Sequence, residues 1–314
     1  LSATGTVGLQ EFKSSWVAAI KRHRNHPSIF DWCGGNEHIW TPRLTRLMNE
    51  LYSLAKDLDP TRPMIASDGN LGYPSGQTNP LIDFYSVDGT PWLGNPPIPT
   101  KPVISHETGN YNTFPRLKKA ISDLTPPGKA SKFLKPFWLT QAHDHLTSTG
   151  LIHENDLWSL RSEQLYVFTW KKLIEGIRAS PYMSGHEWWC FTEFWMAGNG
   201  IVDYAFDFKP GVAQQSIRPF VGDLVLLLNT PGRDVAMAPA FTSGELLRVN
   251  ISLSNYGSGR VSAKNIRWSV VVNGSSVCSG SGTKSTMVEQ GTVSRAVEVK
   301  CRLPTIGTFP SLEN

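Results

Sequence analysis

The stretch RNHPSIFDWCGGNE, residues 24–37, decides the fold of the first part of the chain. Pro27 favours an extended backbone before it, and residues 28–33 form a short apolar run that is typical of a buried strand. Gly34 and Gly35 end this run, and Asn36 and Glu37 follow at once. Apolar residues at helical spacing occupy positions 9–24. The sequence therefore predicts a helix, a buried strand, and a polar loop that begins near Glu37.

The same order of elements continues along the chain. Short apolar runs predict further strands at residues 64–67, 82–87, 101–106 and 183–191. Helical patterns occupy residues 42–57 and 157–179. Alternation of strands and helices is typical of a parallel α/β fold. Five strands and one leading helix would be strands four to eight of a (β/α)8 TIM barrel, so the predicted fold class is α/β.

The pattern changes after about Pro210. Residues 223–229, 244–255, 265–273 and 292–303 are rich in β-branched side chains and are separated by Gly, Ser and Asn turns. This arrangement predicts an antiparallel, all-β sandwich of the immunoglobulin-like kind. We therefore expect two domains: residues 1–215, the C-terminal part of a barrel, and residues 216–314, a sandwich that the chain includes only in part.

Composition excludes several classes of protein. Apolar residues make up 40% of the 314 residues and charged residues 18%, which is enough apolar side chain for a packed core. The formal charge of +4 comes from scattered residues, and the densest basic stretch, residues 21–24, lacks interleaved aromatic residues. We therefore expect no nucleic-acid partner. Because no apolar run reaches about 18 residues, we expect no membrane partner either.

The cysteines and sequons bear on location. Four cysteines occur without CxxC spacing, which disfavours a zinc site. Cys278 and Cys301 both lie in the β-rich part and could pair, although their spacing alone does not decide it. Asn250 and Asn273 fit the N-glycosylation pattern, and a secreted or periplasmic location is slightly favoured.

Two glutamates follow predicted strands. Glu37 comes after residues 28–33, and Glu107 comes after residues 101–106. In (β/α)8 barrels the catalytic residues lie at the C-terminal ends of the strands, so these two carboxylates would face each other across the barrel mouth. Glycoside hydrolysis requires two such carboxyl groups around the scissile bond. Strand-end glutamates also serve as helix caps or surface charges, so position alone does not decide.

The motifs around both glutamates resemble those of glycoside hydrolase family 2, which includes β-galactosidases, β-glucuronidases and β-mannosidases. The run RNHPSI, then Trp32, then Gly-Asn-Glu at 35–37 is similar to the family's acid/base strand. SHETG at 105–109 resembles its nucleophile strand, and SGHEWW at 184–189 resembles the last barrel strand. GIVD at 200–203 and Lys209-Pro210 resemble a stretch beyond the barrel.

The resemblance implies roles for individual residues. Glu37 would be the general acid/base, and Glu107 the nucleophile that forms a glycosyl-enzyme ester. Asn36 would donate a hydrogen bond to the sugar 2-hydroxyl. Further candidates for substrate binding are His106, Trp188, Trp189, Asn110, Tyr111 and Trp92. Adjacent tryptophans on a strand face opposite ways, so only one of Trp188 and Trp189 should stack on a sugar.

Other readings have less support. Glu187 and Glu193 are rival carboxylates without a catalytic motif. His143-Asp144-His145 looks like a metal pair, but histidines at this spacing in a polar segment are usually not ligands. GxGxxG, P-loop and Gly-x-Ser-x-Gly motifs are absent from the sequence. We expect neither a metal nor a cofactor.

The sequence therefore predicts a retaining β-glycosidase of β-galactosidase-like specificity, acting on an oligo- or polysaccharide. The alternative is a non-catalytic carbohydrate-binding protein on a glycosidase barrel, but both glutamates and Asn36 are retained. The family normally has further domains and three more strands ahead of these five. We therefore hypothesise that the chain is a fragment of a longer enzyme, and the sugar, the linkage and the oligomeric state are left undecided.

Overall fold

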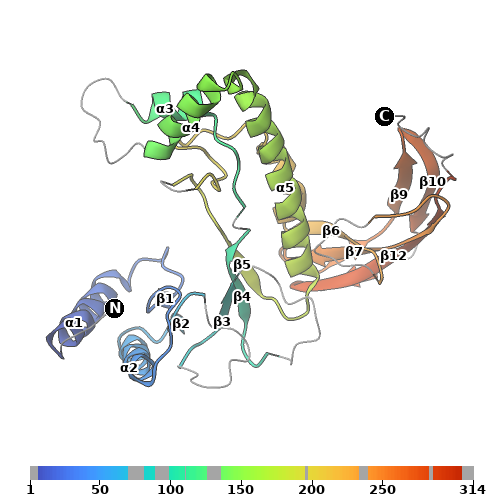
Figure 1. The fold of residues 1–314 in the computed structure, drawn as a ribbon. Coiled ribbons are helices and arrows are strands. Elements are labelled where there is room, and N and C mark those ends of the chain that lie inside the picture. The colour runs from blue at the N-terminus through green and yellow to red at the C-terminus, as the bar shows by residue number, and fades with distance from the viewer. Residues whose placement is uncertain are drawn as a thin grey trace. The chain divides into compact units, whose positions relative to one another are not determined.

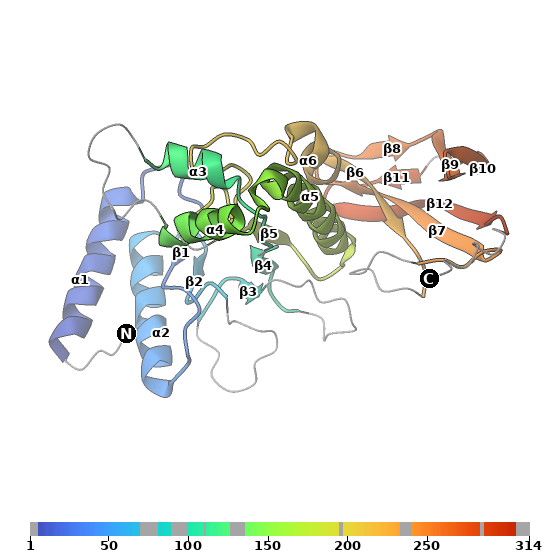
Figure 2. The same ribbon diagram turned by 45° about the horizontal axis from the view of Figure 1, so that its top comes forward.

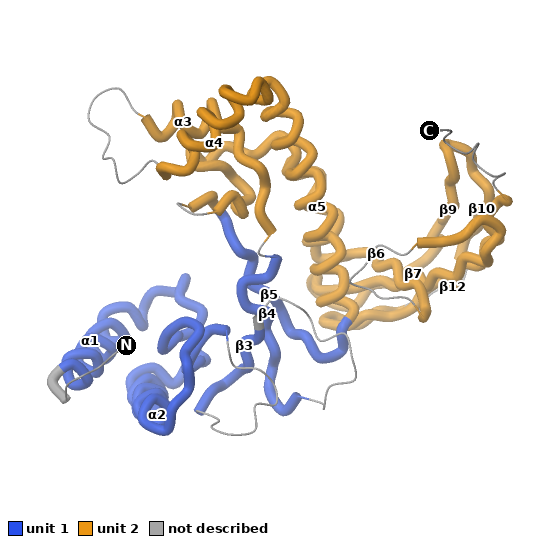
Figure 3. Tube along the Cα trace, in the orientation of Figure 1, with its two compact units in different colours: residues 1–110, 180–191 blue, residues 111–179, 192–314 orange. Residues whose placement is uncertain are grey.

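The computed structural model describes residues 6–69, 81–88, 99–109, 111–125, 136–194, 197–232, 240–282 and 286–305. The chain divides into two compact units, coloured separately in Figure 3. Unit 1 comprises residues 1–110 and 180–191, and unit 2 comprises residues 111–179 and 192–314. The domain boundary expected at residue 215 lies inside unit 2 and stays a prediction.

Unit 1 contains the parallel strands (Figure 1). Its elements, in chain order, are α1 (Thr6–His23), β1 (Trp32–Cys33), α2 (Pro42–Leu58), β2 (Met64–Ile65), β3 (Tyr85–Asp88), β4 (Val103–Thr108) and β5 (Gly185–Trp188). β1 pairs with β2, and β4 lies between β3 and β5, in parallel throughout. Each of these strands lies within or overlaps a segment expected from the apolar runs. Glu107 lies inside β4 and not after it, which corrects the expected strand end.

The two helices of unit 1 lie side by side (Figure 2) and share a core with the first strands. Thr41 caps α2, because its hydroxyl accepts a hydrogen bond from the Leu44 amide at 3.2 Å, and Pro42 occupies the first turn. Leu47, Met48, Leu51 and Ala55 form the buried face of this helix at 3.6-residue spacing. They pack with Ile20, Trp32, Met64 and Ile65.

Arg62 holds the chain in place before β1. Its guanidinium donates to the carbonyls of Ile29 and His26 at 2.8 and 2.9 Å, and to Asp59 at 2.7 Å. Asp59 also accepts a hydrogen bond from the Trp32 indole at 3.0 Å. Desolvation raises the pKa of Asp59, but hydrogen bonds from Thr61, Trp32 and Arg62 outweigh it and lower the pKa to about 2. The carboxylate therefore stays ionised and links the start of β1 to the α2–β2 turn.

Unit 2 begins with helices. They are α3 (Leu117–Asp123), α4 (Phe137–Ser148), the 3-10 turn η1 (Ile152–Glu154), α5 (Asn155–Ala179) and α6 (Gln214–Val221). α3 and α4 share an apolar cluster built on Leu117, Leu139 and Leu146. The long helix α5, expected from residue 157, begins two residues earlier at Asn155. Within the described residues, no helix is long and apolar enough to cross a membrane.

The remainder of unit 2 is antiparallel. Its strands are β6 (Leu224–Asn229), β7 (Leu246–Asn255), β8 (Val261–Ala263), β9 (Ile266–Val272), β10 (Ser275–Gly282), β11 (Thr286–Val288) and β12 (Thr292–Arg302). β7 lies between β6 and β12, while β9 pairs with β10 and β8 with β11. A disulfide joins Cys278 on β10 to Cys301 on β12, so the pairing that the sequence left open is present in the structure. The immunoglobulin-like assignment stays a prediction.

Candidate active site

Strand pairing in unit 1 extends past β1 and β2 and fixes the position of Glu37. Asn36 forms a parallel bridge with Asp68. The Glu37 amide donates to the Asp68 carbonyl at 2.7 Å, and the Asp68 amide donates to the Gly35 carbonyl at 2.8 Å. Gly34 lies so close to β2 that a side-chain carbon there would meet the Ala66 carbonyl oxygen at 2.7 Å. The Gly-Gly-Asn-Glu segment is therefore held against the end of β2.

Glu107 lies at an irregularity in the central strand β4. Ile104 and Ser105 pair regularly with Gly185 and His186 of β5, but the register shifts before the next pair, Thr108 with Trp188. Bulges next to active sites re-aim side chains. Here the shift falls on His106 and Glu107, so it alters the direction of the two residues for which the sequence predicts a role.

Both predicted catalytic glutamates have left-handed backbone conformations. The φ angle is 48° at Glu37 and 43° at Glu107, a region that non-glycine residues rarely occupy. Such conformations cost of order 1–3 kcal/mol each and concentrate at functional sites. Only three other non-glycine residues among those described, Phe206, Asn265 and Asn273, have positive φ. The strain therefore supports a functional role for these two positions.

His106 lies at the centre of an acidic cluster, which we define as Glu37, Asp68, Glu107 and Glu187. Its side chain is 5% exposed. Its Nδ1 lies 3.1 Å from Asp68 and 3.6 Å from Glu187, and its Nε2 lies 3.5 Å from Glu107 and 4.0 Å from Glu37. Neither ring nitrogen makes a hydrogen bond of good geometry within the described residues. The buried imidazole therefore lies next to all four carboxylates of the cluster.

The carboxylates of the cluster lie close enough to act on one bond or to bind one ion. One oxygen of Glu37, one ring nitrogen of His106 and one oxygen of Glu107 all lie within 4.8 Å of one another. Asp68, His106 and Glu187 form a second group of the same kind. Imidazole and carboxylate donors suit divalent cations, so either group could hold one. The first group also has the two facing carboxyl groups that glycoside hydrolysis requires.

Glu187 retains a proton that a free glutamate would lose. Burial, a hydrogen bond with Asp68 and the negative charge of Asp68 together raise its pKa to about 7, against the opposing effect of His106. In neutral solution Glu187 is therefore only partly ionised. Ionisation of Glu187 above this pH adds a negative charge to the cluster.

We expect Glu187→Gln to flatten the pH dependence of stability. Because the folded pKa of Glu187 lies above its ordinary 4.5, the folded state binds its proton more tightly than the unfolded state does. The stabilisation is complete below about pH 4.5 and is lost as the pH rises through about 7. Melting temperatures between pH 5 and 8 should fall less steeply in the variant than in wild type. Glu11→Gln, on an exposed face of α1, is the control, and equal slopes for Glu187→Gln and wild type would contradict the expectation.

The structure brings four of the predicted site residues together. Asn36, Glu37, His106 and Glu107 meet in unit 1, although their roles stay predictions. Trp188 ends β5 and Trp189 follows it, and both are partly buried; the Trp189 amide donates to the Thr108 carbonyl at 3.2 Å. Tyr111 belongs to unit 2 and is 39% exposed, while Trp92 and Asn110 lie outside the described residues. Asp68 was not singled out, although it follows a predicted strand as Glu37 does.

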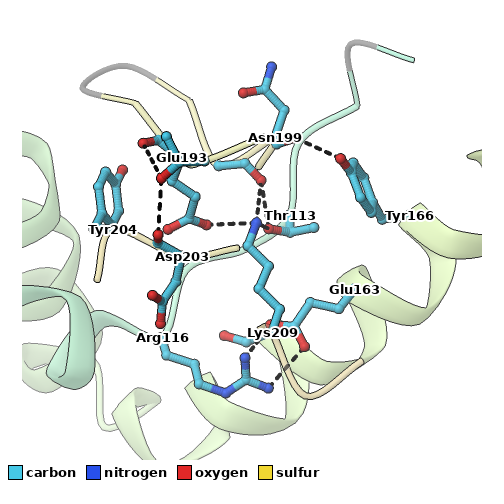
Figure 4. Close-up of polar contacts among 12 residues, drawn as sticks. Thr113, Arg116, Glu163, Tyr166, Glu193, Asn199, Asp203, Tyr204 and Lys209 are labelled. Carbon is cyan, nitrogen blue, oxygen red and sulfur yellow. Dashed lines mark hydrogen bonds and ion pairs between the residues drawn. The ribbon is translucent and has the colours of Figure 1, made fainter. Parts of the chain in front are cut away.

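The rival carboxylate Glu193 is part of a separate buried network in unit 2 (Figure 4). It forms an ion pair with Lys209 at 2.8 Å, and both side chains are 3% exposed. Lys209 also donates to the Thr113 hydroxyl and the Gly198 carbonyl at 2.8 and 2.9 Å. Desolvation raises the pKa of Glu193, although Lys209 opposes the shift. Lys209 thereby ties together segments near residues 113, 193 and 198, which is a structural role.

We expect Lys209→Met to destabilise the protein by about 3–5 kcal/mol. The substitution leaves the Glu193 carboxylate buried without its counter-charge, which is the costly way to break a buried pair. Lys300→Met is the matched control, because Lys300 pairs with Glu298 at 3.2 Å on the surface, with side chains 54% and 46% exposed. That variant should change stability by less than about 1 kcal/mol. Urea unfolding of both variants measures the difference, and equal losses would contradict the structural role of Lys209.

A family model described as "Glycosyl hydrolases family 2, TIM barrel domain" matches residues 9–213. A putative beta-glucuronidase of Formosa agariphila is 40% identical over 67 residues, which are 20% of this chain and 6% of that protein. The crystal structure of a beta-D-mannosidase from Dictyoglomus thermophilum aligns with 96% of this chain and 38% of its own, with a TM-score of 0.50 and 16% identity. A Faecalibacterium prausnitzii beta-glucuronidase aligns with 67% of this chain and 34% of its own, with a TM-score of 0.43 and 17% identity. The chain thus spans 38% of the mannosidase, and that likeness concerns the fold alone.

Proposed function

The chain belongs to glycosyl hydrolase family 2, in its TIM barrel domain, and from this premise we propose that it acts as a retaining β-glycosidase. Glu37 is the proposed acid/base and Glu107 the proposed nucleophile. Glu107 attacks the anomeric carbon and forms a glycosyl ester, while Glu37 gives its proton to the leaving oxygen. Water, deprotonated by Glu37, then cleaves the ester and regenerates both residues.

One observation carries the proposed mechanism. An oxygen of Glu37 and an oxygen of Glu107 lie within 4.8 Å of each other. Retaining glycosidases have carboxyl groups about 5–5.5 Å apart, whereas inverting enzymes need about 6.5–9.5 Å to admit a water. The short separation supports direct attack by Glu107. Asn36, adjacent to the acid/base, is the proposed donor to the sugar 2-hydroxyl.

The architecture of the family supports the finer fold prediction. We propose that β1–β5 correspond to strands four to eight of the barrel, and that β6–β12 belong to an immunoglobulin-like sandwich. Because the chain spans 38% of the solved mannosidase, the activity is proposed for the full-length protein. All experiments below therefore use the protein at its full natural length.

The proposed sugar is neutral, with β-galactosides as the first choice. For Glu37, Asp68 and Glu187, the described residues provide no lysine or arginine ion pair, and the imidazole of His106 is their shared neighbour. A uronate carboxylate about 6 Å from one further charge would be repelled by about 3 kcal/mol at an effective dielectric constant of 20. This argument favours galactosides over glucuronides, although two of the similar proteins above are β-glucuronidases by name.

We expect 4-nitrophenyl β-galactoside to be hydrolysed at least about 100-fold more efficiently than the matching β-glucuronide, because roughly 3 kcal/mol corresponds to that ratio. The two substrates share a leaving group, so kcat/KM compares the sugars directly. The β-mannoside serves as a neutral control. Preference for the glucuronide would show that a cation outside the cluster binds the carboxylate, and it would overturn the neutral-sugar proposal.

Covalent trapping tests the mechanism. The protein is incubated with 2-deoxy-2-fluoro β-galactoside, β-mannoside and β-glucuronide carrying activated leaving groups, and peptides are analysed by mass spectrometry. An adduct on Glu107 supports the proposal, since fluorine slows hydrolysis of the ester. An adduct elsewhere overturns the assignment. Glycan binding without any adduct or hydrolysis would favour the alternative of a carbohydrate-binding protein.

A further inference from the structure

A group of three metal-ligating side chains lies beside the proposed catalytic pair. One carboxylate oxygen of Asp68, one ring nitrogen of His106 and one carboxylate oxygen of Glu187 all lie within 4.8 Å of one another. We propose that these three side chains, which we call the metal triad, bind one divalent transition-metal ion. The sequence alone predicted no metal, because the three residues are far apart in the chain and no motif joins them.

His106 is the residue that points to a bound cation. Its side chain is 5% exposed, and neither ring nitrogen makes a hydrogen bond of good geometry with another described residue. Its Nδ1 faces two carboxylates, at 3.1 Å from Asp68 and 3.6 Å from Glu187. Buried polar atoms are nearly always satisfied, so an unsatisfied imidazole nitrogen between two carboxylates needs a physical explanation. A cation bound by all three groups provides that explanation.

The spacing of the donor atoms suits a first-row transition metal. Bonds of about 2.0–2.2 Å from zinc to nitrogen or oxygen place tetrahedral ligands roughly 3.3–3.6 Å apart. The distances of 3.1 and 3.6 Å from the His106 Nδ1 to Asp68 and Glu187 lie close to this range. Imidazole suits zinc and related metals, whereas sites built from oxygen ligands alone suit Mg²⁺ or Ca²⁺. The mixed ligand set therefore favours Zn²⁺ over Mg²⁺.

The strands of unit 1 hold the metal triad in place. His106 lies on β4 and Glu187 on β5, and these two strands pair in parallel. Asp68 is tied to β3 through Ser86, whose hydroxyl donates to the Asp68 carboxylate and accepts from the Gly69 amide at 2.8 Å. Because each ligand is held by strands of this chain, the triad does not depend on further strands ahead of β1.

The two ring nitrogens of His106 have different roles in this proposal. Ligation through Nδ1 leaves the proton of the neutral imidazole on Nε2, because the ring nitrogen opposite the metal keeps the hydrogen. The Nε2 atom lies 3.5 Å from Glu107. The bound ion would thereby direct an N–H group toward the proposed nucleophile. This link to Glu107 rests on the proposed function, whereas metal binding itself does not.

Zinc titration of the full-length protein tests the metal triad. The protein is stripped with a chelator, dialysed, and titrated by calorimetry with Zn²⁺ and, separately, with Mg²⁺. We expect Zn²⁺ to bind more tightly than Mg²⁺. Glu187→Gln and Asp68→Asn should each weaken zinc binding by more than about 100-fold, because changes to residues that only support the ligands already cost about 10–100-fold. Ser86→Ala removes such a supporting hydroxyl and should weaken binding by about tenfold.

Two control variants locate the ion. Glu37→Gln removes a carboxylate that contacts the other ring nitrogen, and it should change zinc affinity by no more than about fivefold, as expected for a charge that is not a ligand. His143→Gln disrupts the histidine pair on α4 and should have no effect. Loss of binding in Glu37→Gln but not in Glu187→Gln would place the ion elsewhere in the acidic cluster and overturn the triad. Loss in His143→Gln alone would overturn it as well.

Spectroscopy of the wild-type protein tests the site without any substitution. Mn²⁺ replaces zinc in the stripped protein, and pulsed EPR measures the coupling of the ion to nitrogen. We expect coupling to one imidazole nitrogen, from His106. Absence of nitrogen coupling would overturn the proposed site even if the variants failed to fold.

Labelling of Glu107 tests the link to the nucleophile. The rate of labelling by the 2-deoxy-2-fluoro sugar is compared in stripped and zinc-loaded protein. We expect labelling to be about fivefold slower without zinc, which is the effect of one ordinary hydrogen bond. Equal rates in protein that binds zinc would overturn the link to Glu107 and leave the metal triad standing. No labelling in either state would overturn the proposed function, while the titration would still decide the metal triad.

Discussion

Glu107→Gly is expected to reduce kcat for an activated aryl β-galactoside by on the order of 10⁴-fold or more, because the covalent route disappears with the nucleophile. Glycine is the suitable replacement. The φ angle of 43° at this position strains any side chain, whereas glycine adopts it freely. The folded protein should therefore survive the substitution, and lost activity can be attributed to lost chemistry.

Azide identifies the role that Glu107 has lost. In the glycine variant a small anion can occupy the space of the carboxylate and attack the anomeric carbon from the same face. We expect azide to restore activity and to yield the α-glycosyl azide, which NMR distinguishes from the β-anomer. Glu11→Gln should retain wild-type rates with or without azide. Formation of the β-anomer would contradict the assignment of Glu107 as the nucleophile. Failure of azide to restore activity to both glycine variants, Glu107→Gly and Glu37→Gly, would contradict it as well.

The strand-end rule explains why the sequence predicted the core of the site. Glu37 and Glu107 each lie at the end of an apolar run, and a parallel arrangement brings such ends to one edge. The same rule should have singled out Asp68, which follows Met64–Ser67 and contacts His106 at 3.1 Å. An aspartate before a Gly/Asn-rich stretch also fits a turn, so its position alone does not decide between a turn and a site.

Properties that depend on neighbouring strands could not be predicted. The burial of His106 follows from strands β3 and β5 on either side of β4, and the raised pKa of Glu187 follows from its contact with Asp68. Neither contact has a signal in a single segment.

The local composition of β10 explains why the sequence did not predict this strand. Its sequence, SSVCSGSG, is rich in serine and glycine, so its low β propensity favoured a turn. It pairs with β9 through a two-residue hairpin in which Asn273 and Gly274 have φ angles of 49° and 80°. Asn-Gly with positive φ at both positions is the strongest short-range hairpin signal. Tertiary pairing and the Cys278–Cys301 disulfide thus outweigh propensity in this segment.

Strain at Glu37 and Glu107 connects the fold to the proposed chemistry. The Glu37 amide donates to the Asp68 carbonyl, and the Asp68 amide donates to the Gly35 carbonyl. Glu107 is held because β4 pairs with β3 on one side and with β5 on the other. Strand pairing surrounds Glu107, because Ser105 and Thr108 both pair with β5 on either side of the irregularity. The left-handed turn then brings each carboxylate to within 4.0 Å of His106 instead of continuing the pleat. Well-paired strands thereby hold two costly conformations in place.

Glu37→Gly is expected to lower activity by an amount that depends on the leaving group. A general acid contributes about 10²–10⁴-fold, and the contribution is largest when the departing oxygen is basic. For a methyl or benzyl β-galactoside we expect the full loss. For a 2,4-dinitrophenyl glycoside, whose oxygen leaves without a proton, glycosylation should be nearly normal and the second step, in which Glu37 activates water, should become limiting.

Azide also tests the role of Glu37, because azide attacks without the help of a general base. In Glu37→Gly it should attack the glycosyl ester on Glu107 from the opposite face to that ester and yield the β-glycosyl azide, with faster turnover of the dinitrophenyl substrate. The φ angle of 48° at Glu37 makes glycine the strain-free replacement at this position too. Glu107→Gly and Glu37→Gly should thus yield opposite anomers of the glycosyl azide, and this difference would distinguish the nucleophile from the acid/base. Equal losses for good and poor leaving groups would instead place the acid at another residue, and Glu187, which keeps its proton to about pH 7, would be the first to test.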